Sequence, residues 1–221
     1  GRVITHDSQG NAISRPYGIS MDCQGNYWVC DKDKGLFKIT PTGNGYQTIN
    51  ICHNDNDPYS LSSNAAYQAV EDKQGNIWVA TYGGGVNVVR KDKNGRYIAL
   101  HYKNVMGRYP HNAHRKVRTI ALAKDGKVWA GSTDGILIMQ IRNEKITIEV
   151  MQSPERLEDG LMSYDIVNLL ADKKGNMWVG TNSGGLSRTD GHDENGAWKF
   201  KNYGIADGLP SEEIRSIAID E

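Results

Sequence analysis

The sequence predicts an all-β protein made of repeated four-stranded antiparallel sheets. A pattern of the form Asp-x-x-Gly-Asn-x-Trp, followed by a small residue and a glycine turn, recurs along the chain. Four tryptophans mark its copies, with spacings of 50, 51 and 49 residues: Trp28, Trp78, Trp129 and Trp178. The chain has 25 glycines and only 6 prolines among its 221 residues, which suits many tight turns between short strands. No long window shows the 3.6-residue periodicity of a helix.

Each repeat is expected to contain four short strands. A first, apolar strand ends at the repeated Asp, and a second strand carries the Trp. A third strand follows a glycine-containing turn, and a fourth follows a polar turn such as "KNGR" or "DENGA". The first strands, which would lie innermost, are expected near residues 17–22, 67–72, 118–123, 166–172 and 214–220.

The repeated residues have physical roles that follow from their chemistry. The Asp side chain can accept hydrogen bonds from turn amides, and the Gly supplies the positive φ that such a turn needs. The Trp is a large apolar body that can pack against the next repeat. The residue two places after it is always small, so Cys30 at this position is expected to be buried. The third copy departs from the pattern with Ala123 and Lys127 in place of Asp and Asn.

Sheets of about 50 residues that pack face to face around an axis form a β-propeller. We therefore expect residues 1–221 to be a β-propeller fragment with about four four-stranded antiparallel blades. A partial outer strand at 1–7 and a partial inner strand at 214–221 cannot together complete one blade. The chain is thus expected to be part of a larger propeller of about seven blades. The blades are placed approximately at 15–52, 65–104, 115–152 and 164–203.

Charge and composition argue against several classes of function. Lys plus Arg and Asp plus Glu each number 26, so no global field favours nucleic acid. No apolar run approaches the roughly 20 residues of a membrane span. The three cysteines form no Cys-x-x-Cys motif, and the Gly-Gly pairs lack the Lys-Ser/Thr and the helix of a phosphate-binding loop. We expect no cofactor and no metal.

The repeat is similar to that of a known family. The pattern D-x-x-G-N-x-W-V-G-T-x-x-G-G-L, preceded by an I-x-x-I/L-x-x-D strand, resembles the two-component regulator propeller repeat. The segments "YGIADGLPSEEIRSIAIDE" (203–221) and "YSLSSNAAYQAVEDKQGNIWVAT" (59–81) are similar to the loop that connects outer and inner strands in this family. The resemblance extends over essentially the whole chain.

This resemblance implies a sensor. Propellers of the family form the periplasmic part of membrane-bound regulators, most of them hybrid two-component histidine kinases. Intact receptors carry further propeller repeats, a β-sandwich domain, a membrane helix and cytoplasmic kinase modules, and a homodimer is expected. The resemblance therefore implies a non-catalytic, periplasmic module for signal transduction, which senses a small ligand such as an oligosaccharide.

Propellers commonly bind ligands at one rim, in loops that join outer to inner strands and second to third strands. Tyrosines beside Asp, Asn and Arg suit sugars, because a ring can stack on a tyrosine while polar groups bind its hydroxyls or acidic substituents. Several basic residues near one inner-strand entrance favour an acidic sugar. The predicted ligand-binding residues are Asp31, Lys32, Tyr82, Arg115, Arg118, Tyr164 and Asn182.

The sequence is also compatible with other functions. A stand-alone propeller enzyme similar to streptogramin lyases would need a catalytic histidine at an inner position, where this chain has Tyr17, Tyr67, Arg118 and Val167. A lectin-like binding module acting alone is a further alternative. The loops "HNAH" (111–114) and "HNDNDP" (53–58) could bind a metal, but neither has a complete ligand pattern.

Overall fold

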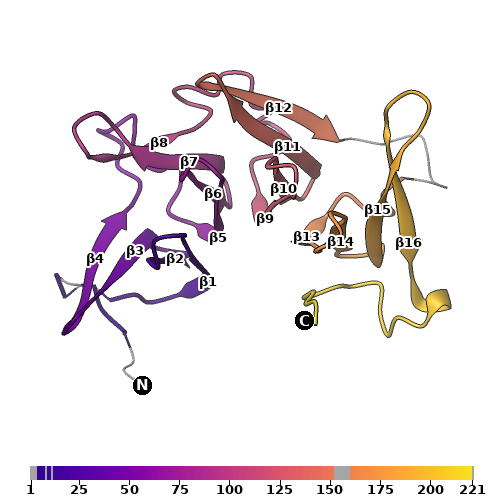
Figure 1. Cartoon of the computed structure of the whole chain (residues 1–221), viewed down its shortest axis with the longest axis horizontal. Coiled ribbons are helices and arrows are strands. Elements are labelled where there is room, and N and C mark those ends of the chain that lie inside the picture. The colour runs from indigo at the N-terminus through magenta and orange to yellow at the C-terminus, as the bar shows by residue number, and fades with distance from the viewer. Residues whose placement is uncertain (1–3, 8, 11, 152–159, 221) are drawn as a thin grey trace. The chain divides into compact units, whose positions relative to one another are not determined.

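The computed structural model describes residues 4–7, 9–10, 12–151 and 160–220. By their internal contacts these residues form two compact units, 1–117 and 118–221. The structure contains four four-stranded antiparallel sheets, and each sheet takes its strands in chain order (Figure 1). The predicted all-β class is confirmed. The only helical segment among the described residues is the single 3-10 turn Ile205–Asp207.

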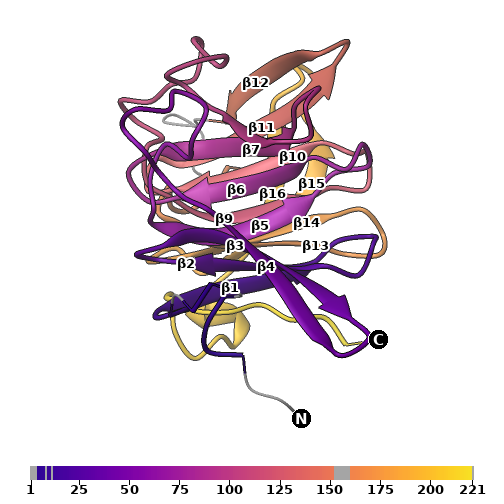
Figure 2. The same ribbon diagram turned by 90° about the vertical axis from the view of Figure 1, so that its left-hand side faces the viewer.

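The first unit contains two of these sheets, and the hairpin of β3 and β4 extends beyond the shorter β1 and β2 (Figure 2). Strand β6 is an unbroken buried run, "IWVAT", whereas all residues of the outer strand β4 except Ile51 are exposed or half-buried. The strands are β1 (Pro16–Met21), β2 (Tyr27–Asp31), β3 (Gly35–Thr42), β4 (Gly45–Ile51), β5 (Ala66–Glu71), β6 (Ile77–Thr81), β7 (Gly85–Lys91) and β8 (Tyr97–Leu100).

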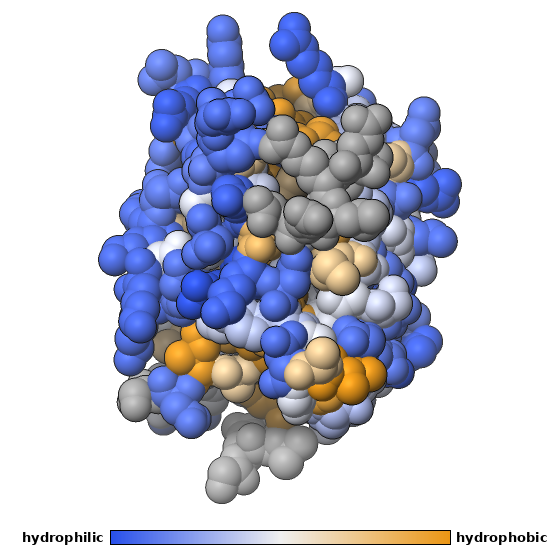
Figure 3. All heavy atoms as spheres, turned by 90° about the vertical axis from the view of Figure 1, so that its right-hand side faces the viewer, coloured by the Kyte–Doolittle hydropathy of each residue, from blue (hydrophilic) through white to orange (hydrophobic). Residues whose placement is uncertain are grey.

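The second unit repeats this arrangement with two more sheets. The face toward β15 and β16 is mostly hydrophilic, with a few hydrophobic areas (Figure 3). Its strands are β9 (Val117–Leu122), β10 (Val128–Ser132), β11 (Gly135–Arg142), β12 (Lys145–Met151), β13 (Ile166–Ala171), β14 (Met177–Thr181), β15 (Leu186–His192) and β16 (Trp198–Tyr203). The first four predicted inner strands are thus found within one residue of their expected ends.

The predicted partial blades do not form strands where the structure describes them. Residues 214–220 have no strand conformation, although the Ile214 amide donates to the Thr181 carbonyl at 2.9 Å. An inner strand needs a second strand to complete its ladder, and no described strand pairs with this segment. Residues 1–3 lie outside the described residues. Among the described residues before β1 (4–7, 9–10 and 12–15), the pairing found is one isolated bridge, between His6 and Ala12.

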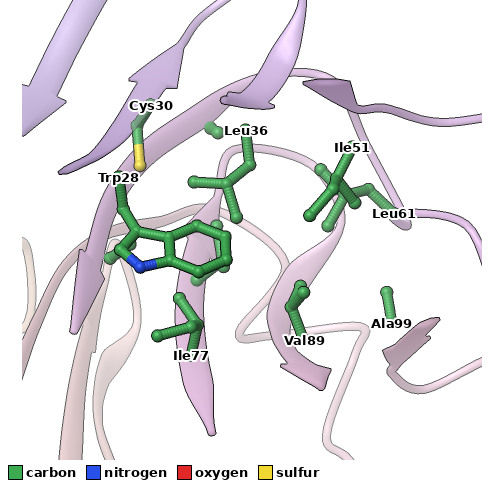
Figure 4. Close-up of a cluster of buried hydrophobic side chains, with 11 residues drawn as sticks. Trp28, Cys30, Leu36, Ile51, Leu61, Ile77, Val89 and Ala99 are labelled. Carbon is green, nitrogen blue, oxygen red and sulfur yellow. The ribbon is translucent and has the colours of Figure 1, made fainter. Parts of the chain in front are cut away.

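The core of each unit lies between its two sheets. In the first unit Trp28, Cys30 and Leu36 of one sheet pack with Ile77 and Val89 of the other (Figure 4). Cys30 is fully buried, as predicted, and burial raises the pKa of its thiol. In the second unit an equivalent cluster joins residues of both sheets around Trp129. Each of these tryptophans therefore binds one repeat to the next.

The repeated Asp side chains hold both the turn and the tryptophan. The Asp72 carboxylate accepts the Trp78 indole N–H at 2.8 Å and the Asn76 backbone N–H at 3.0 Å. Equivalent indole bonds measure 2.9 Å from Trp28 to Asp22 and 3.1 Å from Trp178 to Asp172. The third repeat has no such acceptor, since Ala123 takes this place.

The hydrogen bonds received by the Asp carboxylates also shift their ionisation. Desolvation raises the pKa of Asp172, but hydrogen bonds from the Asn176 side chain and backbone and from the Trp178 indole outweigh it. They lower its pKa to about 2. The same balance lowers the pKa of Asp22. Both groups therefore stay ionised in the folded chain at neutral pH.

One sheet face of the first unit carries exposed apolar side chains. Ile19 is 70% exposed and Met21 63% exposed, both on β1. In the next repeat the residue equivalent to Ile19 is Ala69, which is only 5% exposed because it packs in the core between the sheets. The β1–β4 sheet thus presents to solvent the type of surface that the β5–β8 sheet buries.

Candidate functional site

Three of the innermost strands, β1, β5 and β13, begin with a β-bulge that sets one residue apart. The register shifts between Pro16 and Gly18 in β1, and likewise between Ala66 and Gln68 in β5. Tyr17 and Tyr67 are therefore the extra residues of their bulges. Bulges often re-aim a side chain at a sheet end. In β13 the same shift sets Val167 apart.

Three tyrosines of the first unit form a continuous aromatic surface, the tyrosine row: Tyr17, Tyr67 and Tyr82. The ring centroids of Tyr17 and Tyr67 are 4.5 Å apart and tilted by 49°. Those of Tyr67 and Tyr82 are 5.6 Å apart and nearly parallel, at 21°. Tyr82 directly follows β6, and its amide donates to the Ala65 carbonyl at 2.9 Å. Tyr17 is 59% exposed, so the row reaches solvent.

Two lysines lie over the tyrosine row. The Lys32 ammonium lies 3.8 Å from the Tyr17 ring centroid and 4.7 Å from that of Tyr67. The Lys116 ammonium lies 5.5 Å from the centroid of Tyr82. Each such contact contributes about 0.5–1 kcal/mol when exposed. The tyrosine row with these lysines can offer both a flat apolar face and positive charge.

Lys32 is held in place by its neighbour Asp31. Asp31 is fully buried, and its carboxylate accepts four backbone N–H groups. Oδ2 accepts from Ser14 at 2.9 Å and Arg15 at 2.7 Å, and Oδ1 accepts from Asp33 at 2.8 Å and Lys34 at 3.0 Å. Desolvation opposes ionisation, but these bonds lower its pKa. Asp31, which was predicted to bind ligand, thus has both carboxylate oxygens engaged by backbone amides, and it orders the loop around Lys32.

Arg115 lies at the same edge as the tyrosine row. Its carbonyl accepts the amides of Gly83 at 2.8 Å and Gly85 at 2.9 Å, which fastens the turn after Tyr82. Its side chain is exposed, and it directly precedes Lys116. Of the seven predicted residues, Lys32, Tyr82 and Arg115 thus gather at one edge of the first unit.

Three of the predicted residues, Arg118, Tyr164 and Asn182, lie in the second unit, around an ion pair. Arg118 binds the Asp165 carboxylate at 2.6 Å, and both side chains are partly exposed. The amide of the exposed Asn182 donates to the Asp165 carbonyl at 2.9 Å. Tyr164 is half-buried, and its carbonyl accepts the Gly135 amide at 2.8 Å. Arg118 and Asn182 are thus both joined to Asp165, which was not among the predicted residues.

The prediction also missed Tyr17, Tyr67 and Lys116. A signal for the first two was present, since each is the second residue of an inner strand. Arg118 occupies the same repeat position, because the spacing from Tyr67 to Arg118 equals that from Trp78 to Trp129. Aligning the repeats and considering every residue at this position, rather than Arg118 alone, would have identified both tyrosines.

The histidine-containing loops use their side chains locally. His53 bonds the Leu61 carbonyl at 2.6 Å and the Asp55 carboxylate at 3.0 Å. His111 stacks on Tyr102 with ring centroids 3.7 Å apart. Across the described parts of the chain, no three His, Cys, Asp or Glu side chains group as metal ligands would. Nor does any helix there have the length and apolar character to cross a membrane.

Comparison with solved structures shows the fold. The extracellular domain assigned to a hybrid two-component system of B. thetaiotaomicron matches over 90% of this chain, with 21% identity and a TM-score of 0.61. PorZ, a surface component of the type-IX secretion system of Porphyromonas gingivalis, matches over 96%, with 16% identity and a TM-score of 0.63. Virginiamycin B lyase of Staphylococcus aureus matches over 91%, with 16% identity and a TM-score of 0.59.

The chain spans only part of each of these proteins: 24% of the first, 30% of the second and 60% of the third. No curated protein sequence matches the chain significantly. The profile of the two-component regulator propeller family matches residues 60–83 and 160–183. Both segments run from the loop before an inner strand to the turn after the Trp strand, as the sequence resemblance implied. The chain therefore has the β-propeller fold, and two of its segments match the two-component regulator propeller repeat.

Proposed function

We propose that the chain is a non-catalytic, ligand-sensing part of the periplasmic region of a hybrid two-component histidine kinase. The ligand is a small molecule, an oligosaccharide. Two kinds of similarity support this function: the matched repeats and the fold shared with an extracellular domain assigned to such a system. The rest of the receptor, including further propeller repeats and a β-sandwich domain, supplies the connection to the membrane, and the intact receptor is a homodimer.

The tyrosine row is the observation that carries the ligand proposal. Sugar rings stack on aromatic faces through their apolar C–H surfaces, and three successive rings give room for more than one sugar. Lys32 and Lys116 lie at the same surface and can bind hydroxyl or acidic groups of the ligand. Arg115 adds a further exposed cation beside Lys116.

The main alternative is a propeller enzyme. A histidine-to-alanine variant of virginiamycin B lyase is catalytically inactive. The bulge positions of this chain carry Tyr17, Tyr67 and Val167, with Arg118 at the equivalent place in β9, so no histidine stands there. Turnover of quinupristin by the purified chain would favour a lyase, and binding of a sugar without turnover would favour a sensor or a lectin-like module.

The test is a calorimetric screen of the chain against neutral and acidic oligosaccharides, followed by substitution in the row. Tyr67→Ala removes the central ring, which contacts both neighbours, and should weaken binding roughly tenfold or more. Tyr59→Ala is a matched control, because Tyr59 is 40% exposed in the same unit and belongs to no ring pair of the row. Equal affinity of wild type and Tyr67→Ala for every bound sugar would refute this site.

A further inference from the structure

A second candidate site lies at the opposite end of the inner strands of the first unit. Tyr17 is near the start of β1, whereas Asp22 and Cys23 follow directly after its last residue. Here a cavity of about 580 Å³ opens between the two sheets of the unit. Its volume lies in the range of small-molecule sites. We call it the basic groove, and its principal lining residues are Lys38, Glu71, Lys73, Arg90, Lys91 and Tyr97.

The charge of the basic groove is unbalanced. Four cations line it, against the two carboxylates Asp22 and Glu71. Both carboxylates already accept hydrogen bonds from the turn after β1. Asp22 accepts from the Trp28 indole at 2.9 Å, and Glu71 accepts from the Cys23 amide at 2.6 Å and the Cys23 thiol at 3.4 Å. The surplus positive charge therefore favours an anionic ligand.

An aromatic ring lies among these cations. The Lys38 ammonium donates to the Tyr97 hydroxyl at 3.0 Å, and the Lys91 ammonium lies 5.4 Å from the Tyr97 ring centroid. Tyr97 in turn meets Trp28 edge to face, with ring centroids 5.9 Å apart at 83°. This contact with a core residue orients the tyrosine. The groove thus combines the oriented Tyr97 ring with an ammonium group at its hydroxyl and another near its face.

The repeat itself does not require these cations. The equivalent groove of the second unit has the same floor, with Trp129 and Trp198 meeting edge to face at 5.0 Å. Its volume is about 320 Å³. There Ile138 lies opposite Trp129 in the ladder, as Lys38 lies opposite Trp28, and His192 lies opposite Trp198, as Lys91 lies opposite Tyr97. Packing at the first of these positions is therefore achieved without a charge, so the Lys38 ammonium is not needed to join the repeats.

We infer that the basic groove binds an acidic sugar of one or two rings, with its carboxylate or sulfate groups on Lys38, Arg90 and Lys91 and a ring face beside Tyr97. This site is separate from the tyrosine row, so a test of the basic groove does not depend on whether the proposed function of the row is correct. Cationic side chains with several N–H donors suit carboxylates and sulfates, and the contact should weaken as salt rises.

The probe is digalacturonate, titrated calorimetrically into the whole chain at low and at 0.5 M salt, with cellobiose as the neutral counterpart. The variant Lys38→Ile introduces the side chain that the second unit carries opposite its tryptophan, and Lys91→Met removes the second ammonium group from beside Tyr97. Each is expected to weaken digalacturonate binding at least fivefold. Lys124→Met, in the groove of the second unit, and Tyr67→Ala, in the tyrosine row, are the controls and should leave this binding within twofold.

Thermal unfolding of each variant, followed by circular dichroism, separates loss of binding from loss of fold; Lys91 is the safer position because its side chain is exposed. Wild-type affinity in a folded Lys91→Met variant would overturn the inference. So would equal weakening by Lys124→Met, since this would indicate general attraction to charge. Absence of any digalacturonate binding to the wild type, or binding lost only in Tyr67→Ala, would also overturn it. In the last case the tyrosine row would still be supported.

Discussion

The hydrogen bond from each tryptophan to the repeated Asp can be tested at Asp72, where its removal has a predictable cost. In Asp72→Ala the Trp78 indole N–H loses its acceptor at 2.8 Å, and Trp78 has no exposed surface through which water could replace it. An orphaned buried donor costs about 1–3 kcal/mol, and loss of the turn bonds adds about 1 kcal/mol. We therefore expect a destabilisation of about 2–4 kcal/mol.

For a domain of this size that loss corresponds to a decrease in Tm of about 4–16 °C, which calorimetry or urea unfolding would measure. Asp92→Ala is the matched control. Asp92 caps the same kind of turn, accepting the amides of Asn94 at 2.9 Å and Arg96 at 3.0 Å, but no indole reaches it. It should destabilise the protein less than Asp72→Ala does, because only turn amides lose an acceptor.

A double-mutant cycle isolates the indole bond. Trp78→Phe removes the donor, so Asp72→Ala should cost about 1–2 kcal/mol less in the Phe background than in the wild type. If the two Asp→Ala variants lose equal stability, or if the Asp72 and Trp78 substitutions are additive, the indole bond is not what the repeated Asp contributes.

Two further predictions concern packing and pH. A Cβ at Gly131 would lie 2.5 Å from the Ile166 Cγ2 atom and 2.7 Å from that of Thr119, so Gly131→Ala should destabilise by about 1–3 kcal/mol. Urea unfolding checks this, and a neutral result would show that the sheets can separate there. Because the folded pKa of Asp172 is depressed to about 2, its contribution to stability is present above the unfolded value near 4 and is lost as pH falls from about 4 to 2. Unfolding measured at pH 7, 4 and 2.5 should show this loss, and Asp172→Asn should reduce it; an unchanged profile in that variant would contradict the assignment.

The order of the strands was predictable because the same sequence pattern recurs in four repeats. The Asp-to-Trp pattern places a turn before the second strand, and local turn chemistry does not depend on distant contacts. The hydrogen bond from the Trp indole to the repeated Asp was not predicted. The pattern shows that the two residues are six positions apart, but it does not show that the turn between them brings their side chains together. The strand predicted at 214–220 was wrong because a strand depends on a partner, which no local pattern supplies.

The candidate site was predicted only in part. Loop position placed Lys32 and Tyr82 among the candidate residues, and both lie at the tyrosine row, yet it could not show that Asp31 is turned inward onto four backbone amides. Whether a carboxylate meets solvent or its own backbone is decided by loop conformation. Likewise, the side-by-side placement of Tyr67 and Tyr82 depends on how β5 and β6 pair.

The bulge at the start of β1, β5 and β13 has a consequence for how such a protein can change over time. Because the bulged residue stands outside the ladder, its identity is uncoupled from the register that holds the sheet together. Tyrosine occupies this place in two of these repeats and valine in the third. Specificity can therefore diversify one position at a time while the architecture is inherited intact, which makes these positions the natural targets for retuning the protein toward a new molecule.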